Sequence, residues 1–158
     1  MPAAVPDETG RVRFEDLVPD DTMLAIIAAD LEARRPIGAR LVVEPPFYQG
    51  VTVVARLRPR PDVSVVRLRA QAEEALYRYL DPIVGGPDGH GWPFGRPVHS
   101  GEVFGVLQRL PGVEVVEEVR MFPADPLTGR RGDEVTRIEL DRHALVFSHQ
   151  HQIRVEER

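Results

Sequence analysis

The sequence predicts an α+β fold, in which two or three helices pack on one face of a mostly antiparallel sheet. Residues 51–58 and 113–121 alternate between two sets of side chains, a pattern typical of strands. Residues 23–31, 65–79 and 103–110 instead repeat apolar side chains every three or four positions, which is typical of helices with one buried face. The segments follow the order helix, strand, strand, helix, helix, strand, strand, strand, and this order favours helices gathered on one side of a sheet.

Length and composition fit one domain with a leader in front of it. The chain has 158 residues, of which 42% are hydrophobic and 28% are charged, as is ordinary for a globular protein. Residues 1–20 are rich in proline and acidic side chains and show no periodicity, so we expect a mobile leader or linker there. Residues 21–158 are then expected to form the α+β domain.

The first predicted helix is bounded by a capping residue and a proline. Asp20 or Asp21 can accept hydrogen bonds from its first turn, and Pro36 cannot continue its hydrogen-bond ladder. The apolar residues between them fall along one face: Met23, Leu24, Ile27, Ala28 and Leu31. Residues 39–46 are predicted to form a short strand that a pair of prolines closes.

The clearest predicted strand covers residues 48–60. One face of it consists of Val51, Val53, Ala55 and Leu57. The opposite face carries Thr52, Val54, Arg56 and Arg58. Asp62 is the predicted cap of a second helix over residues 63–80. The apolar stripe of this helix consists of Val65, Leu68, Ala72, Leu76 and Tyr79.

A third helix and the remaining strands follow. Ser100 is the predicted helix cap, with Glu102 near the positive end of the helix dipole. The buried side of the helix consists of Val103, Val106, Leu107 and Leu110. Residues 113–122 are predicted as a strand with Val113, Val115, Val119 and Met121 in phase. Residues 135–140 are predicted to return as a hairpin, and residues 151–157 to form a last short strand.

Charged residues lie on one face of both long strands. Glu118 and Arg120 occupy the side of their strand opposite the apolar residues, as Arg56 and Arg58 do on theirs. If the two strands are neighbours, charge pairs between them would fix the register.

A connector, residues 79–99, packs many glycines and prolines around the only tryptophan. Its glycines miss the phosphate-binding G-x-G-x-x-G spacing by one residue, and no Lys-Ser or Lys-Thr pair follows. Glycine permits positive φ and proline fixes φ, so we interpret the segment as a link of definite shape between two helices. Trp92 and Phe94 are expected either to anchor it in the core or to contact a partner protein.

Three histidines near the C-terminus raise a metal-binding alternative. His149 and His151 would point to the same side of a strand, and His143 lies nearby, but a zinc site needs three or four converging ligands. The absence of cysteine excludes disulfides and thiolate sites. No catalytic triad or paired carboxylates can be named, so we expect no enzyme, cofactor or metal. The alternative is a free-standing module that binds a small ligand or a metal.

Charge and hydropathy limit the partners. The formal net charge of −5 argues against a nucleic-acid partner, which normally selects a basic excess. No apolar run approaches the roughly 18 residues of a membrane span, and the N-terminus lacks the pattern of a secretory signal. We therefore expect no membrane partner and a cytoplasmic location.

Several motifs occur in a distinctive order. "ALYRYLDP" runs into "GGPDGHGWPFGRPVHSGEVFGVLQRLPGVEVVEEV", and "LDRHALVFSHQHQIRV" follows near the end. Together with "RRPIGARLVVEPPFYQGVTVVARLRPR" upstream, these motifs cover roughly residues 20–156 and resemble the C-terminal portion of baseplate J-like proteins. Members of that family are wedge components of contractile phage tails and of related extracellular contractile injection particles.

The resemblance implies a structural role without catalysis. Wedge proteins join in a six-fold ring around the central hub and spike, beneath the sheath. The expected partners are therefore other wedge proteins, with sheath and hub or spike proteins, in a particle assembled in the cytoplasm. Family members are usually several hundred residues long, so the chain resembles only a part of them. The residues expected to anchor the connector or to form interfaces are Trp92, Phe94, Arg96, Arg56 and Arg58.

Overall fold

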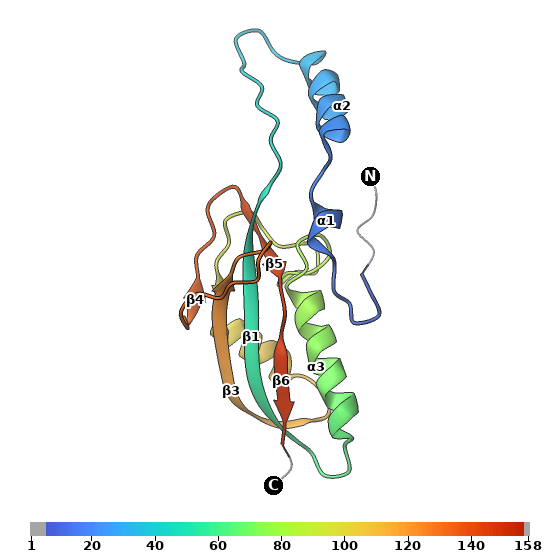
Figure 1. The fold of residues 1–158 in the computed structure, drawn as a ribbon, viewed down its shortest axis with the longest axis vertical. Coiled ribbons are helices and arrows are strands. Elements are labelled where there is room, and N and C mark those ends of the chain that lie inside the picture. The colour runs from blue at the N-terminus through green and yellow to red at the C-terminus, as the bar shows by residue number, and fades with distance from the viewer. Residues whose placement is uncertain (1–5, 157–158) are drawn as a thin grey trace.

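The structure, a computed structural model, describes residues 6–156 of the chain. Its helices are α1 (Phe14–Leu17), α2 (Asp21–Glu32), α3 (Val65–Tyr79) and α4 (Ser100–Gln108). Its strands are β1 (Phe47–Pro59), β2 (Val98–His99), β3 (Val113–Ala124), β4 (Arg137–Ile138), β5 (Ala144–Ser148) and β6 (Gln152–Val155). These elements confirm the predicted α+β class (Figure 1).

The main sheet is built around β1. β3 pairs with one edge of β1 in the antiparallel sense, and this is the longest pairing in the sheet, in line with the antiparallel sheet that the sequence predicts. β5 and then β6 pair in parallel with the other edge of β1. A second, two-stranded sheet joins β2 to β4 in the antiparallel sense.

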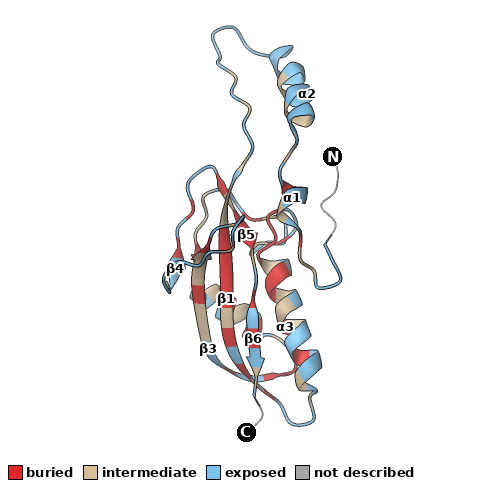
Figure 2. Ribbon diagram, viewed as in Figure 1, coloured by how far each residue is buried: buried red, intermediate tan, exposed pale blue. Residues whose placement is uncertain are grey.

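The core lies between the main sheet and the helices α3 and α4. The inward face of β1 is buried as predicted, and it belongs to one apolar cluster with Leu68 and Leu76 of α3 and Leu107 of α4. Figure 2 shows the buried residues concentrated along β1 and on the side of α3 that meets the sheet. Each fully buried valine or leucine contributes about 1.5–3 kcal/mol by leaving water.

β3 carries a bulge at Glu117. The register passes from Glu118 directly to Val116 while β1 advances by a single residue, so Glu117 has no partner of its own. The predicted phase of β3 is therefore wrong at Val115, which is 39% exposed, whereas Val116 is buried. A two-residue repeat holds only along an unbroken ladder, and an extra residue moves its neighbours to the other face.

Residues 18–46, which we call the arm, project from one end of the body (Figure 1). α2 begins as predicted after Asp20, whose carboxylate accepts a 2.7 Å hydrogen bond from the backbone N–H of Met23. However, none of its residues is fully buried, so its predicted apolar face is covered at most in part. The strand predicted over residues 39–46 is wrong: this chain returns to β1 in an irregular conformation, because no strand within residues 6–156 lies beside it to complete its hydrogen bonds.

The described part of the expected leader packs against the body. Val12 and Leu17 are buried in a small second cluster with Phe147 of β5. The ring of Phe14 meets the ring of Phe147 edge to face, with 5.3 Å between centroids. Residues 12–17 therefore lie against β5, and Gly10 lies beside Glu74 and Tyr77 of α3. Residues 1–5 fall outside the described part of the chain.

Two of the predicted helix caps are wrong. The N-cap of α3 is Ser64, whose hydroxyl accepts a hydrogen bond from the N–H of Arg67, whereas Asp62 lies in the preceding turn with a left-handed φ of 66°. Aspartate tolerates that conformation better than most residues. The N-cap of α4 is His99, one residue before the predicted Ser100, and no side chain caps this helix.

The chain after β3 forms only part of the predicted hairpin. Arg131 and Val135 return beside β3 as single bridges to Ala124 and Met121, but β4 pairs with β2 instead of β3. β6 lies within the predicted last strand. β5 was not predicted, although a short uninterrupted apolar run is typical of a strand buried on both faces.

Candidate functional site

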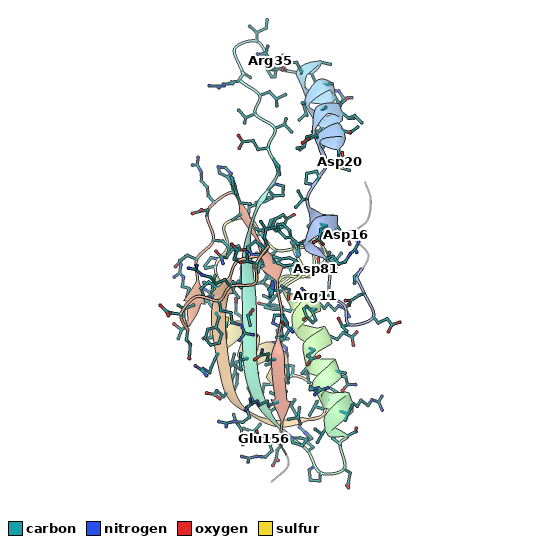
Figure 3. All side chains as sticks on the ribbon, in the orientation of Figure 1. Arg11, Asp16, Asp20, Arg35, Asp81 and Glu156 are labelled. Atoms are coloured by element: carbon teal, nitrogen blue, oxygen red, sulfur yellow. The ribbon has the colours of Figure 1, made fainter. Side chains whose placement is uncertain are left out.

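Asp81 fixes the first turn of the connector, where the chain leaves α3 (Figure 3). Its buried carboxylate accepts hydrogen bonds from the backbone N–H groups of Ile83 at 2.7 Å and Val84 at 2.9 Å. This is the local pairing by which aspartate side chains stabilise turns. The N–H of Gly86 then donates to the carbonyl oxygen of Tyr79 at 2.8 Å, which holds the turn against the end of α3.

Two stretches of the connector lie too close together for side chains. The N–H of Gly91 donates to the carbonyl oxygen of Gly85 at 2.9 Å, and the N–H of Trp92 donates to that of Pro82 at 3.1 Å. Gly86 has a φ of 80°, and a Cβ atom there would lie 2.5 Å from the carbonyl oxygen of Gly91. Only glycine fits this approach, so the glycines give the connector a definite shape.

Trp92 anchors the connector in the core. It is 3% exposed and belongs to the main apolar cluster. Its ring meets the ring of Tyr79 edge to face, with 5.5 Å between centroids, and its indole N–H donates to the carbonyl oxygen of Arg96 at 2.8 Å. A buried tryptophan needs such an acceptor for its N–H. The structure therefore places Trp92 in the core rather than on an exposed contact surface.

Arg96 ties the connector to the first turn of α4. Its guanidinium lies 5.0 Å from the centroid of the Trp92 ring and forms an ion pair with Glu102, in which Nη1 donates to Oε2 at 3.2 Å. The hydrogen bonds to Glu102 raise the pKa of Arg96. Burial disfavours the ionised carboxylate of Glu102, but hydrogen bonds from Arg96 and its charge together hold the pKa of Glu102 below its ordinary value. Both groups are therefore charged at neutral pH.

Phe94 does not anchor the connector by burial, because it is 59% exposed. The backbone provides the anchor beside it: the N–H of Gly95 donates to the carbonyl oxygen of Ala144 at 3.0 Å. Ile83 and Val84, which the sequence did not single out, are exposed as well. Exposed apolar side chains on a rigid segment are typical of surfaces that contact other proteins.

Arg56 and Arg58 lie on the outer face of the main sheet, and no hydrogen bond or ion pair within residues 6–156 joins them to the connector. Arg56 lies 3.5 Å from its register partner Glu118, the cross-strand pair that the sequence predicts. The bulged Glu117 lies 3.3 Å from Arg56 and also pairs with Arg58. These arginines therefore stabilise the strand pair and are partly neutralised.

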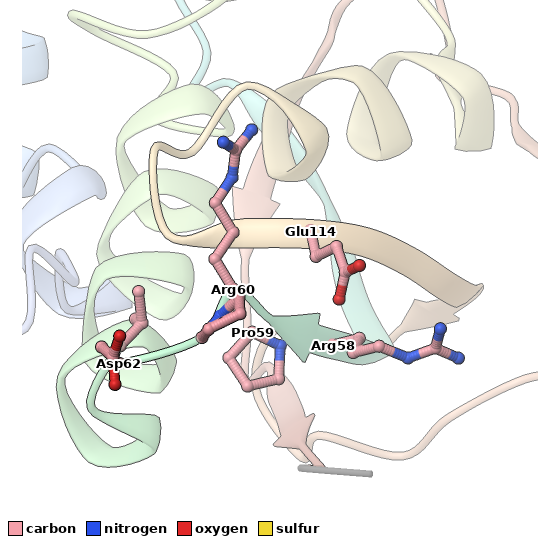
Figure 4. A pocket seen from close by; sticks show the side chains of 7 residues that line it. Arg58, Pro59, Arg60, Asp62 and Glu114 are labelled. Atoms are coloured by element: carbon pink, nitrogen blue, oxygen red, sulfur yellow. The ribbon is translucent and has the colours of Figure 1, made fainter.

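A cavity of about 480 Å³ lies at the end of β1 (Figure 4). It is lined by Arg58, Pro59, Arg60, Pro61, Asp62, Val63 and Glu114. The guanidinium of Arg58 already pairs with Glu117, and the Nε–H of Arg60 donates to the carbonyl oxygen of Val113 at 3.2 Å. The arginines of this cavity are thus occupied by protein groups.

The C-terminal histidines do not form a metal centre. His151 is buried, and its Nδ1 accepts a 3.1 Å hydrogen bond from the N–H of Val53. Its Nε2 therefore carries the proton and donates to Ser148 Oγ at 2.6 Å, so this nitrogen can neither bind a metal nor accept a proton from Ser148. Burial, helped by the charge of Arg11, lowers the pKa of His151 to about 3. No group of three or more histidines and carboxylates within residues 6–156 is placed to hold a metal ion.

Comparison with known proteins assigns no family to the chain. No model of a protein family matches it, and no curated protein matches it significantly. No helix in the described part of the chain has the length and apolar character needed to cross a membrane.

Proposed function

We propose that the chain is a structural component of a baseplate wedge, in a contractile tail or a contractile injection particle. In this role it docks with other wedge subunits and with hub, spike and sheath proteins around a six-fold ring. The observation that carries the proposal is the ordered series of motifs over roughly residues 20–156, centred on the "GWPFGR" connector.

The geometry of the connector supports a docking role. Trp92 and Arg96 hold the backbone in one shape, while Phe94, Ile83 and Val84 remain exposed. A rigid segment loses little conformational freedom when a partner binds, so more of the contact energy contributes to affinity. A stable contact buries about 800 Å² per partner, so we expect neighbouring surface to take part in the contact beside the connector.

Deletion and complementation test the proposal. Deleting the encoding gene should leave particles that lack a baseplate or do not assemble, and the wild-type gene should restore them. Phe94→Asp should fold normally yet restore few particles, because a charge in an apolar contact is costly to bury. Leu127→Asp is the matched control, since Leu127 is also exposed but lies outside the connector. Intact, contracting particles made without the gene would refute the proposal.

The alternative module that binds a small ligand or a metal has no specific observation in its favour. Ligand and metal screens by thermal shift still separate the two functions. A ligand at 100 times its dissociation constant should add about 2.7 kcal/mol to the free energy of unfolding. A wedge component is expected to show no such shift.

A further inference from the structure

The arm carries an apolar helix that the described chain covers only in part: Met23, Leu24 and Ala28 are half-buried, and no residue of α2 is fully buried. Residues 23–29 of α2 form an uninterrupted apolar run. Because a helix completes a turn every 3.6 residues or so, this run surrounds the helix on all sides, and helices of that kind are normally buried. Here no residue of α2 is buried, and Ile26 is 65% exposed. The composition of α2 therefore indicates that a partner covers it.

The returning chain extends the same surface. A groove of about 420 Å³ lies between the two limbs of the arm and is lined by Ala28, Ala29, Glu32, Leu41 and Val43. The small side chains of Ala28 and Ala29 leave room for another chain to approach α2 closely on this side. Further exposed apolar residues of the arm are Ile27, Leu31, Ile37 and Val42. A 12-residue helix is marginally stable on its own in water, so a covering partner would also stabilise it.

The charges of the arm are unevenly distributed: acidic residues lie at the body end, and arginines lie toward the tip beside Asp30 and Glu32. Figure 3 shows Asp20 at the end next to the body and Arg35 at the tip. The acidic residues at the body end are Asp20, Asp21 and Glu44. The basic residues toward the tip are Arg34, Arg35 and Arg40.

Two of the tip arginines are neutralised within the arm. Arg34 pairs with Asp30 at 3.0 Å and Arg35 pairs with Glu32 at 2.8 Å. Arg40 has no ion-pair partner among residues 6–156, so the tip is positive while the body end is negative.

We propose that the arm pairs with the arm of a second copy of this chain, with the two α2 helices antiparallel about a two-fold axis. This orientation sets the negative body end of each arm against the positive tip of the other, at both ends of the contact. A parallel orientation would instead oppose like charges. The apolar runs, which lie between the charged ends, then cover each other. The pairing involves this chain alone and does not depend on the proposed wedge function.

Sedimentation velocity on the purified full chain tests the pairing. We expect a dimer that dissociates on dilution. Ile27→Asp should raise its dissociation constant at least tenfold and leave the melting temperature of the body unchanged, because no residue of α2 is buried in the body. Ile83→Asp, which alters an exposed apolar residue of the connector, should leave the dissociation constant unchanged. A chain that stays monomeric at about 100 μM, well above the micromolar range of an ordinary specific contact, overturns the proposal. A dimer that persists unchanged in the Ile27→Asp variant also overturns the proposal.

Cysteine cross-linking tests the orientation, and the chain has no cysteine of its own to interfere. The double variant Asp21→Cys with Arg40→Cys should form disulfide-linked dimers under mild oxidation, because the antiparallel pairing brings the two positions together between copies. The single variant Arg40→Cys should form few disulfide-linked dimers, because the two copies of position 40 in an antiparallel pair lie at opposite ends of the contact. If the single variant cross-links as readily as the double variant, the arms do not run antiparallel and the proposal is wrong.

Discussion

Trp92 donates its indole N–H to the carbonyl oxygen of Arg96, 2.8 Å away, while the guanidinium of Arg96 lies 5.0 Å from the centroid of the same indole ring. The two residues thereby close the segment between them into a loop, and the ion pair of Arg96 with Glu102 fastens that loop to α4. The connector thus keeps its shape through a few contacts that single substitutions can remove.

Trp92→Ala should lower the free energy of unfolding by about 3 kcal/mol or more, because it leaves a cavity in the core and an acceptor at Arg96 without its donor. Urea denaturation monitored by circular dichroism measures the change. Phe94→Ala is the control and should change the free energy by less than about 0.5 kcal/mol, since Phe94 is largely exposed. Equal effects of the two substitutions would show that Trp92 is not the anchor.

Gly86 and Gly89 provide a matched pair for the shape of the connector. Both have a positive φ, 80° and 70°, but a Cβ at Gly86 would meet the carbonyl oxygen of Gly91 at 2.5 Å, whereas nothing lies within 4 Å of one at Gly89. Gly89→Ala should lower the free energy of unfolding by about 1–2 kcal/mol, because alanine disfavours a positive φ. Gly86→Ala should cost at least about 1 kcal/mol more in the same denaturation experiment. Equal costs would mean that the connector relaxes around the new methyl group.

The ion pair of Arg96 with Glu102 should contribute measurably to stability. A double-mutant cycle with Arg96→Gln and Glu102→Gln is expected to give a coupling energy of about 1 kcal/mol, since both side chains are less than one third exposed. The same cycle on the more exposed pair of Arg137 with Glu139 should give a coupling close to zero. A coupling at Arg96 no larger than that of the exposed pair would contradict the prediction.

Features that depend on neighbouring residues could be predicted from the sequence. The start of α2 after Asp20 follows from one side chain and the helix behind it, and the inward face of β1 follows from simple alternation. The shape of the connector follows from the backbone preferences of glycine and proline. The expectation that Trp92 is an anchor needed only the general rule that large aromatic side chains are buried.

Features that depend on distant partners could not be predicted. The bulge at Glu117 exists only in relation to β1, so the sequence of β3 alone gives a regular alternation. Residues 39–46 have the composition of a strand but lack a neighbour, and β4 finds its partner in β2, far away in the sequence. Phe94 and Trp92 are both large aromatic residues of the connector, yet Trp92 is buried and Phe94 is exposed. This difference depends on how the connector folds over the body.

His151 makes the stability of the fold depend on pH. Its pKa is about 3 in the folded chain, because of burial, and about 6.5 in an unfolded chain. Between these values the unfolded chain binds a proton that the folded chain does not, so acid favours unfolding. The contribution of neutral His151 is fully present above pH 6.5 and is lost as the pH falls toward 3. Urea titrations should show the free energy of unfolding falling by about 1.5 kcal/mol between pH 6.5 and pH 5.

Two substitutions isolate this contribution. His151→Gln removes the titrating group and should flatten the dependence over the same pH range, whatever it does to stability at pH 7. Some slope should remain, because burial also lowers the pKa of His149. His143→Gln, at an exposed histidine, is the matched substitution with which the effect of His151→Gln is compared. If His151→Gln keeps the full wild-type slope, the proton is taken up elsewhere, and His151 is not the residue through which acid unfolds the chain.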